Sequence, residues 1–113
     1  ALVPYKPDAI LVNCSQGAHI SRAIQKLRQC FKGRIGAYAA GLGSPAKDGG
    51  WKFPLREEEA VSRYLSEVKQ WLRFSPTIIG GCCGTTPRVI CAISGIMKKC
   101  QRGAIDDRMA VFC

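Results

Sequence analysis

Apolar and polar positions follow one another along the chain in blocks that predict short buried strands and amphipathic helices. Residues 9–13 (AILVN) form a continuous apolar run, which is typical of a strand buried on both faces. After a polar turn at residues 14–17, apolar residues recur at spacings of three and four, which predicts a helix. These residues are Ile20, Ala23, Ile24 and Leu27. Gly33 follows the helix as a stop signal.

The middle of the chain repeats this alternation of strand and helix. Residues 34–40 (RIGAYAA) predict a second strand, and residues 41–55 predict a long loop rich in glycine and proline. Residues 56–74 give the clearest helix, with three glutamates in its first turn and one apolar stripe. The stripe consists of Ala60, Val61, Tyr64, Leu65, Val68, Trp71 and Leu72. Residues 77–80 (TIIG) predict a third strand.

A last helix is predicted from Pro87, because proline is favoured at the first helical position and Thr86 can cap the helix. Its apolar side carries Val89, Ile93, Ile96 and Met97. The tail, residues 106–113, is compatible with a last helical turn or with a frayed end, and both interpretations stay open.

This order of elements predicts an α/β fold with a parallel sheet and right-handed crossovers. Three parallel strands alone leave two unpaired edges, so they make a poor independent sheet. An eight-fold β/α barrel uses roughly 31 residues per unit, so a chain of 113 residues holds three to four units. We therefore expect the chain to be the last part of a larger α/β domain. The absence of an initial Met fits this expectation.

Composition narrows the function classes. Hydrophobic residues make up 47% and charged residues 22%, which excludes a disordered chain. No apolar run reaches the roughly 20 residues that cross a bilayer, so no membrane association is expected. The net charge is 17 − 8 = +9, but the basic residues are scattered, which favours a solvated surface over a nucleic-acid site.

Seven cysteines are the unusual feature of the composition. An odd number with no visible secretory signal argues against a disulfide framework and indicates a reducing, cytoplasmic location. Three of them are expected to be small buried hydrophobes, namely Cys30, Cys91 and Cys100.

Cys14, Cys82 and Cys83 are different, because each directly follows a predicted strand. Cys14 and Cys82 are 82 − 14 = 68 positions apart, which spans two β/α units and places them across one intervening strand. Three thiolates there would leave the fourth position of a tetrahedral zinc ion open, as in a catalytic site. Buried structural thiols and a redox-active vicinal disulfide between Cys82 and Cys83 are the alternatives.

These motifs resemble a known family. The sequence GGCCGTTP at residues 80–87 is similar to the closing motif of the homocysteine S-methyltransferase domain. The sequence VNC at residues 12–14 is similar to that family's earlier ligand motif, and the aromatic loop and Trp71-Leu72 also match it in position. The resemblance covers about residues 9–97.

The resemblance implies that residues 1–113 are part of the homocysteine-binding domain, about the last three β/α units of a TIM-type (β/α)8 barrel. It implies zinc held by Cys14, Cys82 and Cys83, with no catalytic residue beyond these ligands and no substrate-binding residue assigned. The implied reaction transfers a methyl group from a donor, such as S-methylmethionine, betaine or methylcobalamin, to the thiol of homocysteine, which forms methionine. The missing strands would be required as partners. A truncated, inactive scaffold is the alternative.

Four further positions carry weaker expectations. The family usually has Asn where this chain has Ala40. His19 is either a proton relay beside the site or, as we favour, a partly exposed helix residue. Trp51 and Phe53 either cover the donor methyl group or, as we favour, pack the loop. Asn13 either orients the mouth of the site or caps a turn.

Overall fold

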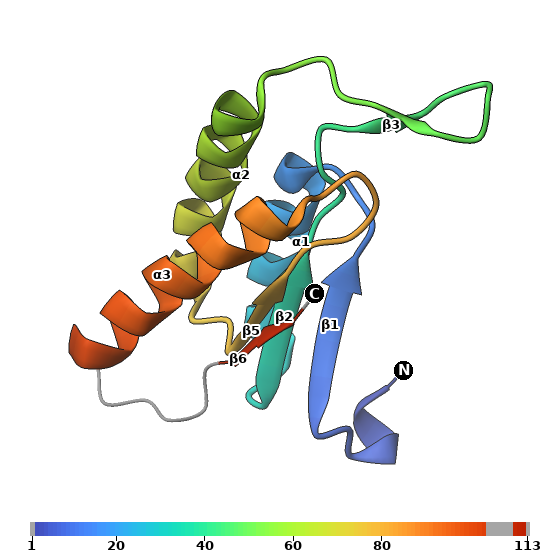
Figure 1. Ribbon diagram of the computed structural model, residues 1–113. Helices are drawn as coiled ribbons and strands as arrows, with labels where there is room; N and C mark the ends of the chain where they lie inside the picture. The colour runs from blue at the N-terminus through green and yellow to red at the C-terminus, as the bar shows by residue number, and fades with distance from the viewer. Residues whose placement is uncertain (1, 104–109, 113) are drawn as a thin grey trace.

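A parallel four-stranded sheet positions all other elements of the molecule (Figure 1). The structure is a computed structural model that describes residues 2–103 and 110–112. The strands lie in the order β1-β2-β5-β6, and each neighbouring pair is parallel. Their bounds are β1 Ala9–Asn13, β2 Arg34–Tyr38, β5 Ile78–Gly80 and β6 Ala110–Phe112. The predicted α/β class with a parallel sheet is therefore confirmed.

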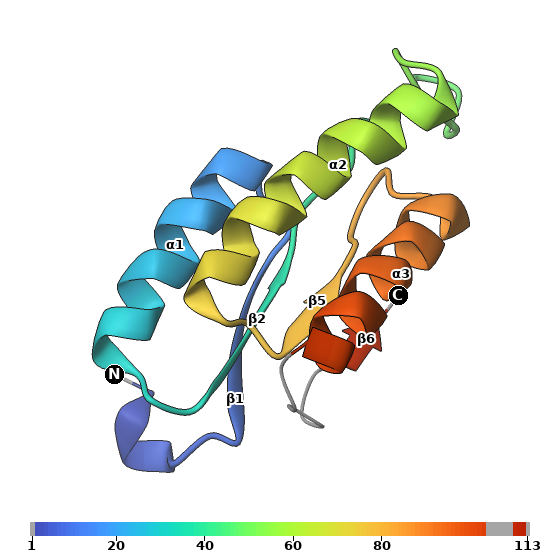
Figure 2. The same cartoon turned by 90° about the vertical axis from the view of Figure 1, so that its left-hand side faces the viewer.

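Three helices cover one face of this sheet, as Figure 2 shows with the helices in front of the strands. They are α1 Gly17–Cys30, α2 Glu57–Trp71 and α3 Pro87–Gly103, and short 3-10 turns lie at Val3–Tyr5 and Leu72–Phe74. The helices and the sheet share one apolar core. It includes Ile20, Ile24, Ile35, Ala37, Val68, Trp71, Ile79, Ile93 and Met97.

Within residues 2–103 and 110–112, no helix lies on the other face of the sheet (Figures 1 and 2). Leu11 on β1 is 38% exposed there. A Cβ atom built at Gly36 would touch both Leu11 and Ile78, so these two side chains meet over the middle strand on that same face. In the part of the chain that the structure describes, the sheet thus has helices on one face and a partly apolar surface on the other.

The helix ends follow the expected chemistry in part. Helix α2 begins with Glu57, Glu58 and Glu59, which suit the positive end of the helix dipole. Helix α3 begins at Pro87 as predicted. The expected Thr86 cap is wrong, because the buried Thr86 hydroxyl has no hydrogen-bond partner among the described residues.

Three further features differ from the expectation. The tail supplies a fourth strand, β6, which pairs with β5 through Ile78 and Ala110; the rest of residues 104–113 lies outside the described part. The long loop contains a short antiparallel hairpin, β3 Ser44–Pro45 with β4 Trp51–Lys52. Cys30 and Cys91 are exposed and Cys100 is half-buried, so none is a fully buried hydrophobe.

Candidate metal centre

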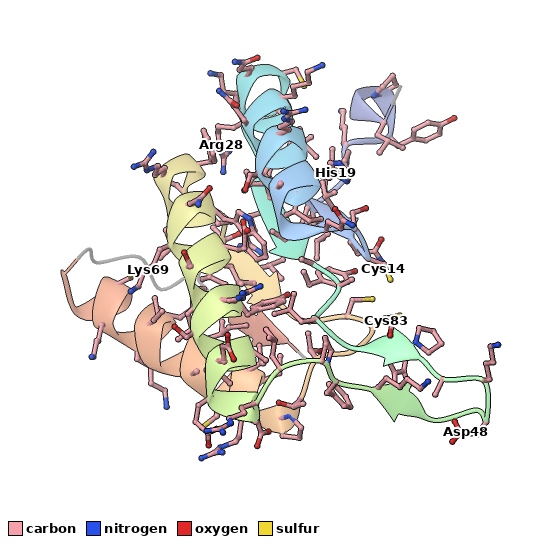
Figure 3. The ribbon with its side chains drawn as sticks, turned by 90° about the horizontal axis from the view of Figure 1, so that it is seen from above. Cys14, His19, Arg28, Asp48, Lys69 and Cys83 are labelled. Atoms are coloured by element: carbon pink, nitrogen blue, oxygen red, sulfur yellow. The ribbon has the colours of Figure 1, made fainter. Side chains whose placement is uncertain are left out.

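Two strand ends bring three cysteines to one point at the carboxyl edge of the sheet. Cys14 follows β1, and Cys82 and Cys83 follow β5, with β2 between them. The sulfur atoms of Cys14 and Cys83 are 3.4 Å apart, and those of Cys82 and Cys83 are 4.0 Å apart. All three sulfur atoms lie within 4.8 Å of one another. Figure 3 shows Cys14 and Cys83 facing each other from separate loops.

Main-chain hydrogen bonds from the end of β2 and the residues after it fix the positions of the two loops that carry the cysteines. The Cys14 amide donates to the Tyr38 carbonyl oxygen at 3.1 Å, which extends the β1–β2 ladder by one residue. On the other side, the Cys82 amide donates to the Ala39 carbonyl oxygen at 3.0 Å. The distance between the cysteines is therefore fixed by backbone rather than by their side chains.

Two further main-chain hydrogen bonds join the same loops. The Ala40 amide donates to the carbonyl oxygen of Ser15, next to Cys14, at 2.9 Å. The Gly41 amide donates to the Cys83 carbonyl oxygen at 2.7 Å. Consecutive residues of the middle loop thus bind both cysteine-bearing loops.

Unusual backbone conformations turn the sulfur atoms toward each other. Cys14 has a φ of 48°, which is rare for a residue with a side chain. Gly84 has a φ of 70°, which closes the turn after Cys83. The Thr85 hydroxyl donates to the Cys82 carbonyl oxygen at 2.6 Å and holds this turn. Adjacent Cys82 and Cys83 can therefore face one point, although neighbours along an extended strand face opposite ways.

The thiols influence one another strongly. Hydrogen bonds from Cys82 and then from Cys83 lower the pKa of Cys14 below its ordinary value. The hydrogen bonds that Cys83 makes to Cys14 and to Cys82, together with their charges, raise the pKa of Cys83 to about 11. One thiolate is therefore favoured in the cluster, while three would repel one another unless a cation lay between them.

The spacing suits a zinc ion. Zinc–sulfur bonds of about 2.3 Å in a tetrahedral site place two thiolates about 3.8 Å apart. The observed 3.4 and 4.0 Å bracket this value. Cys14 and Cys83 are exposed and Cys82 is half-buried, so the cluster opens outward on one side. The donor set and its geometry therefore fit a soft divalent metal with one open position.

The other sequence candidates do not join the cluster. His19 lies exposed in the first turn of α1, and the metal-binding group found among the described residues consists of the three cysteines alone. Trp51 and Phe53 are 45% and 50% exposed, so the loop is less packed than expected. Phe53 borders a cavity of about 250 Å³ that also touches Gly84. The main-chain carbonyl of Asn13 accepts a hydrogen bond from the Ser15 hydroxyl at 3.3 Å.

One residue near the cluster was missed by the sequence reasoning. Tyr64 on α2 is 5% exposed, and its hydroxyl lies 3.0 Å from the Ala39 carbonyl oxygen and 2.9 Å from that of Gly80. Its place in the apolar stripe of α2 indicated only a core residue. The signal that could have found it is a tyrosine within an apolar stripe, because a buried tyrosine hydroxyl needs a hydrogen-bond partner.

Comparison with known proteins adds evidence of a different kind. A family model for homocysteine S-methyltransferase matches residues 1–97. Homocysteine S-methyltransferase 3 from Arabidopsis thaliana is 32% identical over 91 residues, which are 80% of this chain and 26% of that protein. Methionine synthase from Mycobacterium leprae (strain TN) is 28% identical over 107 residues, which are 93% of this chain and 8% of that protein. No solved structure gives a significant match.

The chain thus spans only a minor part of the length of these relatives. No helix in the described ranges is long and apolar enough to cross a membrane.

Proposed function

Because this chain belongs to the homocysteine S-methyltransferase family, we propose that it forms the metal-binding part of an enzyme that methylates homocysteine to methionine. Cys14, Cys82 and Cys83 are the proposed zinc ligands. The observation that carries this proposal is the convergence of three sulfur atoms within 4.8 Å, from two loops of the sheet edge. Candidate methyl donors are S-methylmethionine, betaine and a cobalamin-bound methyl group.

The chain's own residues account for the binding and orientation of the metal. When bound, a zinc ion would supply the positive charge that keeps a fourth, thiol ligand deprotonated at neutral pH. Three cysteines leave that fourth position free, and the exposure of Cys14 and Cys83 keeps it accessible. The main-chain hydrogen bonds of residues 39–41 hold the three sulfur atoms in place, so little reorganisation is needed when the metal binds.

We further propose that residues 1–113 are about the last three β/α units of a TIM-type barrel. Three features support this: the parallel sheet, the position of the described helices on one of its faces (Figure 2), and the coverage of 26% of a homocysteine S-methyltransferase. The interior of a barrel is lined by the helix-free face of its sheet. Groups that bind the amino-acid end of homocysteine and the methyl donor would then lie in the units that this chain lacks.

Metal analysis of purified variants of the full-length protein tests the ligand assignment. Cys14→Ser, Cys82→Ser and Cys83→Ser should each lose most of the bound zinc, because each removes a soft thiolate. Cys30→Ser is the matched control, since its thiol binds main-chain carbonyls of its own helix at 3.4 and 3.5 Å. Full zinc content in the Cys14→Ser protein would overturn the assignment.

Addition of homocysteine to the zinc-loaded protein tests the open position. A thiol that binds as a thiolate releases a proton, so a weakly buffered solution should become more acidic. Methionine has no thiol proton and should give no signal. A zinc shell of four protein ligands that homocysteine leaves unchanged would indicate a structural metal and contradict the methyltransferase function.

A further inference from the structure

We infer that Tyr64 is a positioning residue for the cysteine cluster, through the ends of β2 and β5. This inference rests on the proposed function, because it concerns the geometry of the same metal site. Tyr64 touches none of the three cysteines by a hydrogen bond; it acts on the main chain that carries them.

The Tyr64 hydroxyl lies where two neighbouring strands separate. Strands β2 and β5 pair through Gly36 with Ile78 and through Ala37 with Ile79. Just beyond this pairing, the hydroxyl lies 3.0 Å from the Ala39 carbonyl oxygen and 2.9 Å from the Gly80 carbonyl oxygen. One hydroxyl proton is shared between two buried acceptors, so the side chain bridges the two strand ends.

These two carbonyl groups lead directly to the cysteines. The Ala39 carbonyl oxygen also accepts the Cys82 amide at 3.0 Å, and Gly80 lies two residues before Cys82. The next residue, Ala40, donates to Ser15 beside Cys14. A shift of the peptide between Ala39 and Ala40 would therefore affect both cysteine loops.

The hydroxyl is itself held in place by its surroundings. The ring of Tyr64 packs edge-on against Trp71, with ring centres 5.8 Å apart and an interplanar angle of 84°. The Trp71 indole nitrogen donates to the Ser21 hydroxyl oxygen at 3.0 Å, a bond in which Tyr64 takes no part. Burial raises the pKa of Tyr64 well above its ordinary value, so the hydroxyl remains a proton donor throughout the working pH range.

Tyr64→Phe is the test variant, because it keeps the ring and removes only the bridge. Ser21→Ala is the matched control, since it also breaks a hydrogen bond of the aromatic layer but leaves the strand ends alone. Zinc affinity would be measured in the full-length protein by competition with a chromophoric chelator. Tyr64→Phe should weaken zinc binding about tenfold or more, as loss of outer-shell support does at other metal sites, and Ser21→Ala should not.

A spectroscopic measurement separates positioning from general stability. Cobalt(II) bound in place of zinc reports the arrangement of its ligands through its visible absorption. We expect the cobalt spectrum of Tyr64→Phe to differ from that of the wild type, and that of Ser21→Ala to match it. Equal zinc affinities and equal cobalt spectra for the two variants would overturn the inference and leave the proposed function intact.

Hydrogen exchange of the metal-free protein tests the inference without zinc. It therefore decides the inference even if the wild type binds no zinc. That absence of zinc binding would refute the proposed function. The Cys82 amide is protected by its bond to the Ala39 carbonyl oxygen. Peptides that contain Cys82 should therefore exchange faster in Tyr64→Phe than in Ser21→Ala. Equal exchange in both variants would overturn the inference.

Discussion

At the scale of single residues, the site depends on main-chain atoms approaching closer than side chains allow. A Cβ atom at Gly41 would collide with the Gly84 carbonyl group. A Cβ atom at Gly84 would lie 2.7 Å from the Gly43 carbonyl oxygen, and Gly84 also has a φ of 70°. The loop after β2 and the turn after Cys83 therefore touch through glycine, which keeps Cys83 close to Cys14.

Gly84→Ala should both destabilise the fold and weaken zinc binding. The left-handed conformation alone costs a residue with a Cβ atom about 1–2 kcal/mol, and the contact with Gly43 adds to this. Denaturant unfolding and zinc titration of the same preparation measure the two effects. Gly95→Ala is the control, because a Cβ atom there meets nothing within 4 Å. It should leave zinc binding unchanged and raise stability by about 0.5–1 kcal/mol. Normal zinc affinity in Gly84→Ala would contradict the role of this turn.

The sequence indicated that the three cysteines lie together, but it did not indicate the main-chain contacts around them. The cysteines stood out because each followed an apolar run, and parallel strands place their carboxyl ends at one edge. Nothing in a periodic pattern shows that the Tyr64 hydroxyl meets two carbonyl groups, since that contact depends on where two strands diverge. The main-chain hydrogen bonds of residues 39–41 could not be predicted either, because they use backbone groups that every residue has.

At the scale of elements, a cationic side chain clamps the amino ends of the strands. Arg28 on α1 donates from Nε to the Phe74 carbonyl oxygen at 3.0 Å and from Nη2 to that of Ser75, also at 3.0 Å. Its Nη1 donates to the Gly33 carbonyl oxygen at 3.0 Å. One guanidinium group thus joins the end of α1, the turn before β2 and the turn before β5. The sequence suggested only a solvated charge near a helix end.

Arg28→Ala should lower the free energy of unfolding by about 1–2 kcal/mol, because one half-buried and two exposed carbonyl groups lose a shared charged donor. Zinc content of the folded variant should stay normal, since Arg28 binds the turns before β2 and β5, whereas the cysteines follow the opposite ends of the parallel strands. Arg63→Ala is the control, because that side chain is 63% exposed and pairs with Glu59 only at 3.9 Å. Its effect should stay within about 0.5 kcal/mol. Equal unfolding midpoints for the two variants would rule out the clamp.

The helices that were predicted from the sequence share a strong apolar period. Helix α2 was predicted over residues 56–74 and observed at Glu57–Trp71 plus a 3-10 turn, because its stripe faces the core along its whole length. Strand β6 was missed because three residues give no period, and its pairing with β5 depends on a distant edge. The two-residue strands β3 and β4 were missed for the same reason.

At the scale of the whole molecule, the sheet is covered on one face and open on the other. Ile35, Ala37 and Ile79 are completely buried beneath the helices. On the opposite face, Leu11 is exposed beside Gly36 and Ile78. In the proposed barrel this face turns inward, where residues of the missing units would pack against it.

The isolated chain of 113 residues should therefore bind a hydrophobic dye and tend to self-associate. Dye fluorescence and light scattering at several concentrations measure these properties. Leu11→Lys should reduce both signals, because it places a charge on the open face. Leu42→Lys is the matched control, since Leu42 is exposed to a similar extent but lies in the loop after β2. A soluble monomer that binds no dye and melts sharply would contradict the role of the open face.

The separation of the cysteines in the chain has a consequence for the kinetics of folding. Cys14 and Cys83 are 69 positions apart, and both β2 and β5 must be paired before their sulfur atoms meet. Closing so long a loop is entropically unfavourable until the sheet supports it, so the cluster forms late in folding. With zinc as the proposed ligand, the unfolded chain presents scattered thiols of ordinary affinity, and only the assembled sheet captures the ion tightly. The rate of zinc uptake during refolding would then report when the sheet is complete.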